Sequence, residues 1–248
     1  MNANIGVSHH IVEPFTEDYC GNLSWGHLGN LLLQCASAHT GAHGFGYGQM
    51  IARSHVWVLS RLVVEMEAMP RTGESFALST WVDKVYHQFT DRHFSVTRPD
   101  GTAYGHATSI WALIDTESRQ PADLVHLPDG GFTSALVPDK PSPIAGLGRI
   151  RLKSPALVAT HKAAFTDLDI NGHVNSIRYI EYLLDHFPAE EMRRQTVRRV
   201  EMAYCTETYC GETVDIYHET DNKTPGRHLF EIRKQADGTV AARGALTF

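Results

Sequence analysis

The stretch DLDINGHVNSIRYIEYLLD, residues 167–185, joins a dense polar cluster to an apolar helical pattern. Two acids, two asparagines, a glycine and a histidine fall within residues 167–175. Apolar residues recur at helical spacing over residues 174–187, and Pro188 follows them. We therefore predict a helix at 174–187 that buries one face and carries polar groups at its first turn.

Strand-like segments surround this helix and a second one. The second helix is predicted at residues 24–44, where leucines recur at helical spacing. Segments rich in β-branched and aromatic residues, with turn sequences such as RPDG at 98–101 between them, predict antiparallel strands. These segments are 53–67, 74–86, 91–98 and 102–115 in the first half, and 197–205, 212–220, 227–235 and 239–248 in the second.

The two halves of the chain repeat one another. VEM, GES and DGT in the first half recur as VEM, GET and DGT in the second, at offsets of 136, 138 and 137 residues. Because the matches keep their order and each block follows a helix, we predict an internal duplication. Each half should form an α+β domain, in which a strand, a long helix and about four further strands build an antiparallel sheet wrapped around the helix. The expected boundaries are 1–130 for the first domain, 131–150 for a linker and 151–248 for the second domain.

The polar cluster distinguishes the second half from the first. The dipeptide FT precedes each helix, at 15–16 and at 165–166, and aligning the two copies places Leu23 opposite His173. On this alignment the polar set occurs in one copy only, whereas a purely structural feature of the fold should occur in both. We therefore expect a reactive site at residues 169–175.

Asp169, Asn171 and His173 are the candidate site residues in this stretch. His173 follows a glycine at the start of the helix, where the N–H groups of residues 174–176 and the helix dipole would hold an oxyanion. Glu207, on or just after the next strand, would activate water as a base. The alternative interpretation is ordinary helix capping and turn formation, with the glutamate at an exposed strand end.

Composition argues against several classes of protein. The formal net charge is −6, so nucleic acid is not expected as a partner. No apolar run is long enough to span a membrane, and the N-terminal residues show no signal-peptide pattern. The four cysteines form no CxxC pair and no HExxH occurs, so we expect free thiols, a cytoplasmic location, no metal and no cofactor.

Several blocks of the sequence together resemble one known family. They are WVLSRLVVEMEAMPRTGESFALSTWV at 57–82, Arg92 with Phe94, SIWALIDTESRQP at 109–121, and the segment 167–185. In this order they resemble the acyl-acyl carrier protein (acyl-ACP) thioesterases, and the similarity covers nearly the whole chain. The resemblance implies two tandem hotdog domains, each an antiparallel sheet around a long central helix.

The resemblance also assigns catalytic residues. The family's Asp-x-Asn-x-His pattern falls on Asp169, Asn171 and His173, and its downstream glutamate falls on Glu207. Plant members carry a cysteine directly after this glutamate, where the present chain has Thr208. Direct attack by water is therefore expected in place of attack by a cysteine.

The resemblance implies hydrolysis of a fatty acyl-ACP thioester to release a free fatty acid. The first domain would bind the acyl chain and carry a degenerate site, and a homodimer is compatible with the resemblance. Because carrier proteins are acidic, residues 149–153 and 193–199 are the candidate basic docking segments. An acyl-coenzyme A thioesterase and a non-catalytic acyl-binding hotdog protein are the alternatives.

Overall fold

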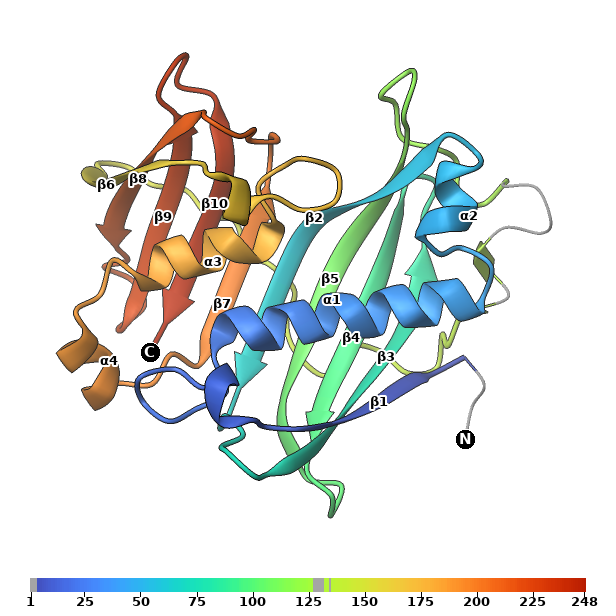
Figure 1. Cartoon of the computed structure of the whole chain (residues 1–248), viewed down its shortest axis with the longest axis horizontal. Coiled ribbons are helices and arrows are strands. Elements are labelled where there is room, and N and C mark those ends of the chain that lie inside the picture. The colour runs from blue at the N-terminus through green and yellow to red at the C-terminus, as the bar shows by residue number, and fades with distance from the viewer. Residues whose placement is uncertain (1–3, 127–131, 134) are drawn as a thin grey trace. The chain divides into compact units, whose positions relative to one another are not determined.

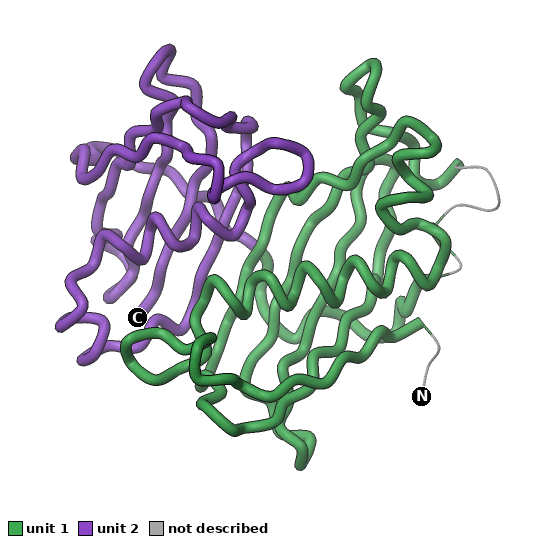
Figure 2. The backbone as a smooth tube through the Cα atoms, in the orientation of Figure 1, with its two compact units in different colours: residues 1–146 green, residues 147–248 purple. Residues whose placement is uncertain are grey.

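The chain folds into two compact units. A computed structural model describes residues 4–126, 132–133 and 135–248. Unit 1 comprises Met1–Gly146 and unit 2 comprises Leu147–Phe248, as the two colours in Figure 2 show. The expected linker is divided between the two units, and the expected domain boundary at residue 130 lies outside the described residues.

Unit 1 is an antiparallel sheet with one long helix lying across it (Figure 1). Its elements are β1 (Gly6–Ile11), a 3₁₀ helix η1 (Pro14–Thr16), α1 (Trp25–Ala42), α2 (Tyr47–Ile51), β2 (His55–Met66), β3 (Ser75–Val85), β4 (Phe89–Thr97) and β5 (Ala103–Asp115). The strand order is β1-β3-β4-β5-β2, and every pairing is antiparallel. Helix α1 packs against β1 and β3 and buries Leu28 and Leu32 completely, as the leucine spacing predicts.

Unit 2 has the same kind of architecture (Figure 1). Its elements are β6 (Ala156–Lys162), a 3₁₀ helix η3 (Phe165–Asp167), α3 (Ser176–Leu184), α4 (Ala189–Arg194), β7 (Arg199–Tyr204), β8 (Thr213–Thr220), β9 (Arg227–Lys234) and β10 (Val240–Thr247). The strands are ordered β6-β8-β9-β10-β7 and pair antiparallel. Helix α3 packs on β7 and β10 and buries Ile177, Ile180 and Leu183.

The strand orders confirm the internal duplication. Across the sheet, the first, third, fourth, fifth and second strands of each unit in chain order follow one another, as β1, β3, β4, β5 and β2 in unit 1 and as β6, β8, β9, β10 and β7 in unit 2. Each unit places its 3₁₀ helix and its long helix between the first and second of its strands in chain order. The eight strand-like segments of the sequence all form strands within a few residues of the expected bounds.

The helix ends differ from the sequence-based expectation. Helix α3 begins at Ser176, because Asn175 lies outside it as the N-cap and accepts the Ile177 N–H at 2.9 Å. It ends at Leu184, and Pro188 caps the start of the short helix α4. The predicted helix at 174–187 is therefore too long, and α4 was not predicted. Within the described residues, no helix is long and apolar enough to cross a membrane.

Candidate functional site

A closed turn positions the predicted site residues of unit 2. Asp169 Oδ1 accepts the N–H groups of Asn171 and His173, at 2.8 and 3.2 Å. The Asp169 N–H donates in turn to the His173 carbonyl at 2.8 Å. Gly172 has a φ of 78°, which a residue with a side chain rarely adopts. The Asp169 carboxylate thus fixes the backbone that carries residues 171 and 173.

His173 and Glu207 lie side by side in unit 2. His173 Nδ1 is 3.6 Å from Glu207 Oε1, and the two side chains are 22% and 26% exposed. The backbone holds this approach, because the Val174 N–H donates to the Thr208 carbonyl at 2.8 Å. A separation slightly beyond hydrogen-bond distance is common for catalytic pairs without substrate. Partial exposure leaves the pair accessible to water and to a substrate carbonyl.

Tyr209 is a member of the site that the sequence analysis missed. Its hydroxyl donates to Glu207 Oε2 at 3.0 Å. Its ring meets the His173 imidazole edge to face, with centroids 5.0 Å apart at an angle of 89°. The sequence could have indicated this residue by its spacing. In an extended chain the side chains of residues two apart project to the same side, so the side chain of Tyr209 lies on the same side as that of Glu207.

Asn171 is not joined to the pair by its side chain. The residue is exposed, and its N–H group is bonded to Asp169. Within the described residues, no hydrogen bond links the Asn171 side chain to His173 or Glu207. The structure therefore assembles two of the four predicted residues as a side-chain pair, with Asp169 supporting the backbone and Asn171 at the exposed edge.

Two of the three backbone donors that the sequence suggested for an oxyanion are already bonded within the fold. The Val174 N–H already donates to the Thr208 carbonyl, and the Asn175 N–H donates to the Asp167 carbonyl, both at 2.8 Å. The prediction is therefore wrong for these two donors. The reason is that the residues just before α3 pair with the segment around Thr208 and Tyr209. The helix itself therefore begins at Ser176, later than the apolar pattern implied.

Unit 1 contains the same turn with different side chains. Asp18 Oδ1 accepts the N–H groups of Cys20 and Asn22, at 2.8 and 3.1 Å. The Asp18 N–H donates to the Asn22 carbonyl at 2.8 Å, and Gly21 has a φ of 75°. The counterpart of His173 is therefore Asn22 and not Leu23, as the FT alignment had it.

The error has a physical cause and changes the interpretation of the aspartate. The 3₁₀ helix begins at Pro14 in unit 1 and at Phe165 in unit 2, so the FT dipeptides are one position out of register. The turn and its Asp occur in both units, so the aspartate is not specific to the second copy, whereas the Asn171 and His173 side chains still occur in that copy only. Asp169 therefore forms part of the repeated fold, and the two turns differ in the side chains at the positions of Asn171 and His173.

The counterpart of Glu207 in unit 1 is apolar. The Leu23 N–H donates to the Pro70 carbonyl at 2.8 Å, as the Val174 N–H donates to the Thr208 carbonyl. The residue before each acceptor is Met69 in unit 1 and Glu207 in unit 2, and Met69 is buried. Unit 1 thus has an asparagine and a methionine where unit 2 has its histidine and glutamate.

A buried carboxylate beside the turn serves the fold. Asp167 accepts hydrogen bonds from the Ala164 N–H at 2.8 Å and from Arg178 Nε at 3.1 Å, and His161 Nε2 lies 3.0 Å away. Burial alone would raise the pKa of Asp167, but these donors lower it to about 2. The ionised Asp167 connects strand β6, which carries His161, to helix α3, which carries Arg178.

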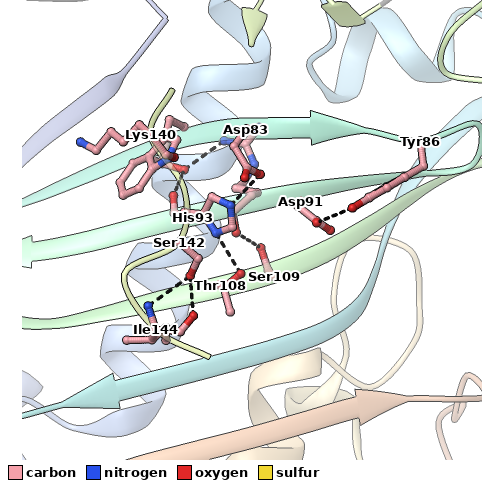
Figure 3. A network of polar contacts seen from close by, with 12 residues as sticks. Asp83, Tyr86, Asp91, His93, Thr108, Ser109, Lys140, Ser142 and Ile144 are labelled. Carbon is pink, nitrogen blue, oxygen red and sulfur yellow. Dashed lines mark hydrogen bonds and ion pairs between the residues drawn. The ribbon is translucent and has the colours of Figure 1, made fainter. Parts of the chain in front are cut away.

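A second polar network lies on the sheet of unit 1 (Figure 3). His93 Nε2 is 2.7 Å from Asp83 Oδ1, and His93 Nδ1 is 2.9 Å from Thr108 Oγ1. The Asp83 and His93 side chains are each only 4% exposed. Trp81, next to His93, donates its indole N–H to the Lys140 carbonyl at 2.6 Å, so the segment around Lys140 covers this face. A network closed in this way links three strands and offers no access to a substrate.

Fold and site together define a class of protein. The chain contains two hotdog units in tandem, each a sheet around one helix, and the second carries a partly exposed His–Glu pair. Residues 8–126 match the family model for the acyl-ACP thioesterase N-terminal domain, and residues 153–248 match the model for the C-terminal domain. The matches cover well over half of the chain, which belongs to the acyl-ACP thioesterase family.

Known relatives agree with this assignment. A solved acyl-ACP thioesterase from Bacteroides thetaiotaomicron is 41% identical and superposes with a TM-score of 0.90 over 100% of both chains. The 12:0-ACP thioesterase from Umbellularia californica is 17% identical and shares the fold, with a TM-score of 0.83 over 100% of this chain and 98% of its own. The predicted fold class is thereby confirmed.

Curated plant relatives are longer than this chain. An acyl-[acyl-carrier-protein] hydrolase from Cuphea viscosissima is 24% identical over 220 residues, which are 83% of this chain and 52% of the relative. An oleoyl-acyl carrier protein thioesterase from Arabidopsis thaliana is 24% identical over 234 residues, 87% of this chain and 62% of the relative. The chain spans about half the length of the first of these relatives.

Proposed function

We propose that this protein hydrolyses the thioester of a fatty acyl-ACP and releases the free fatty acid. The observation that carries the proposal is the pair of His173 and Glu207, 3.6 Å apart and partly exposed, in the second unit of a chain of this family. The replacement of both residues in the first unit supports a single active site per chain.

The proposed mechanism uses water as the nucleophile. Glu207 takes a proton from the water as its oxygen attacks the thioester carbonyl carbon, a general-base step worth roughly 10²–10⁴-fold in rate. His173 and Asn171 orient the water or the carbonyl. The carbon–sulfur bond then breaks, and the leaving thiolate takes up the proton that Glu207 accepted, which returns Glu207 to its carboxylate form. Asp169 supports this geometry through the backbone of the turn.

The acidic carrier protein is proposed to dock on a basic edge of unit 2. Ile150 and Leu152 pack against Leu229 and Ala245, while their neighbours Arg149, Arg151 and Lys153 are exposed. Apolar and basic residues thus alternate along residues 149–153, as they do in an extended segment with one apolar side and one basic side. In the other candidate segment, 193–199, Arg199 already pairs with Glu201 at 2.8 Å.

Two further expectations belong to the proposal. Unit 1 is proposed to hold the acyl chain near the apolar side chains under α1, where it has lost the polar pair. A cytoplasmic location is proposed because the four cysteines are free thiols. His173 and Glu207 come from one chain, so each copy of a homodimer would carry its own pair.

A hydrolysis assay tests the proposal. Acyl-ACP thioesters of graded chain length should be hydrolysed with a higher kcat/KM than the matching acyl-coenzyme A thioesters. The variant Arg151→Glu should raise KM for acyl-ACP and leave the coenzyme A reaction unchanged, because it alters only the charge that meets the carrier. Higher kcat/KM for coenzyme A thioesters would identify an acyl-coenzyme A thioesterase. Binding of acyl chains without turnover would identify a non-catalytic acyl-binding protein.

The thiols should not be needed for the reaction. Thr208 follows Glu207 and is buried, while Cys205 and Cys210 are exposed. We expect that alkylating the accessible cysteines leaves most of the hydrolytic activity, measured as steady-state release of free thiol-bearing carrier. The variants Cys205→Ser and Cys210→Ser should each behave like the unmodified protein. Loss of turnover in either variant, with its circular dichroism spectrum unchanged, would restore a nucleophilic cysteine to the mechanism.

Tyr209 should act as a positioning residue for Glu207. The variant Tyr209→Phe keeps the ring against His173 but removes the hydroxyl that donates to the carboxylate. We expect kcat to fall roughly 10-fold, since a hydrogen bond to a charged group contributes about 1.5–3 kcal/mol. An unchanged kcat would leave Tyr209 with a packing role only.

A further inference from the structure

Two histidines and an aspartate converge on the surface of unit 1, outside the proposed catalytic residues. Asp123 Oδ2 lies 3.2 Å from His87 Nδ1 and 2.8 Å from His126 Nδ1. One donor atom from each of the three residues fits within a span of 4.8 Å, and all three residues are exposed. Two separate segments supply them: the turn between β3 and β4 and the segment that follows β5.

The backbone holds these segments together. The Leu124 N–H donates to the His87 carbonyl, and the Ala122 N–H donates to the Leu113 carbonyl of β5, both at 2.7 Å. The Leu124 side chain is fully buried in the core of unit 1. The positions of residues 87 and 123 are therefore set by the fold rather than by the contact between their side chains.

The aspartate is oriented before any ligand binds. Asp123 Oδ1 accepts the N–H groups of Val125 and His126, at 3.0 and 3.3 Å, which leaves Oδ2 directed at the two imidazoles. A carboxylate that backbone donors fix through one oxygen, with the other oxygen directed at imidazole nitrogens, is the arrangement found around protein-bound metals.

The donor set fits one chemical class of cation. Imidazole nitrogens with a carboxylate suit zinc, nickel, copper and iron, whereas magnesium and calcium prefer oxygen ligands alone. Metal–ligand bonds of about 2.0–2.2 Å place neighbouring donor atoms about 3 Å apart. The observed separations of 2.8 and 3.2 Å are of this size.

We propose that His87, Asp123 and His126 form a binding site for a divalent transition-metal ion such as Zn²⁺. The ion replaces the protons on the two Nδ1 atoms, which leaves each imidazole neutral and protonated at Nε2. Water completes the coordination on the exposed side. The bound ion clamps the β3–β4 turn to the segment 121–126 and takes no part in thioester hydrolysis.

Isothermal titration calorimetry of the full chain without a histidine tag tests the site. One equivalent of Zn²⁺ should bind, and Mg²⁺ should give no heat. His87→Gln and His126→Gln should each weaken Zn²⁺ binding at least about 10-fold, since even supporting residues at metal sites have effects of this size. His9→Gln is the matched control, an exposed histidine of the same unit, and should bind like the unmodified protein. Equal binding by His87→Gln or His126→Gln, or equal loss in His9→Gln, would overturn the site.

Hydrogen exchange on the unmodified chain gives a second readout that needs no variant. Addition of Zn²⁺ should slow exchange of the backbone amides in residues 121–126, because clamping reduces local opening. The amides of α3 in unit 2 should be unaffected. Exchange at 121–126 that does not respond to saturating Zn²⁺ would overturn the clamp.

Discussion

Replacing Glu207 by glutamine should lower kcat by roughly 10²-fold or more, because the amide cannot take the proton from water. The amide keeps the shape of the side chain and its contact with the Tyr209 hydroxyl, so the turn and the His173 approach should survive. KM should change little, since the base acts chiefly in the transition state. Steady-state hydrolysis of a long-chain acyl-ACP measures both parameters.

The control for this variant is a glutamate outside the site. Glu117 lies exposed in the turn after β5, and Glu117→Gln should have the kinetics of the unmodified protein. Circular dichroism checks that both variants fold. Near-normal kcat in well-folded Glu207→Gln would exclude Glu207 as the base and transfer the role to His173.

Replacing His173 by asparagine should cause a loss of kcat comparable to that of Glu207→Gln. Asparagine is the residue that unit 1 carries at the same position, where its N–H donates to the aspartate of the turn. The variant therefore removes the imidazole from a turn that is known to form with asparagine, and its effect on stability should be small. The double variant His173→Asn/Glu207→Gln should lose far less activity than the product of the single losses, because the two residues act as a unit.

The unit 1 turn supplies the matched control for His173. Asn22→Ala alters the corresponding position in the copy that lacks the pair, so it should leave kcat unchanged in a folded protein. Kinetic losses that multiply in the double variant would show that His173 and Glu207 act independently. A fall in kcat for Asn22→Ala equal to that for His173→Asn would remove the distinction between the two units.

Most of the architecture was readable from the sequence. The strand segments were recognisable by their β-branched and aromatic residues and by the turns between them, and the helix leucines at 28 and 32 are fully buried as expected. The repeated VEM, GES and DGT motifs revealed the duplication, because each stands at a strand or turn that both units share. The proximity of His173 to Glu207 followed from the family pattern and not from spacing, since strand pairing decides which distant residues meet.

Register and local pairing were harder to predict. The FT dipeptides matched in letters, but the 3₁₀ helices start one position apart, so Leu23 was paired with His173 in error. The N–H groups of Val174 and Asn175 were assigned to an oxyanion, although carbonyls of distant residues already accept them. The first error came from a match of two letters that does not follow the start of the 3₁₀ helices, and the second came from acceptors outside the helix that a local pattern does not reveal.

The turn at Asp18 in unit 1 and at Asp169 in unit 2 forms in both units, although only unit 2 carries the proposed reactive side chains. The Asp and the Gly that form it are the same in the two copies, whereas the residues whose N–H groups bond to the Asp are Cys20 and Asn22 in one and Asn171 and His173 in the other. The backbone of the turn therefore forms with either set of side chains, because its hydrogen bonds involve the Asp carboxylate and main-chain groups only. The reactive residues of such a turn can be exchanged by a few substitutions without a penalty from misfolding, so a duplicated chain of this kind needs only one reactive copy.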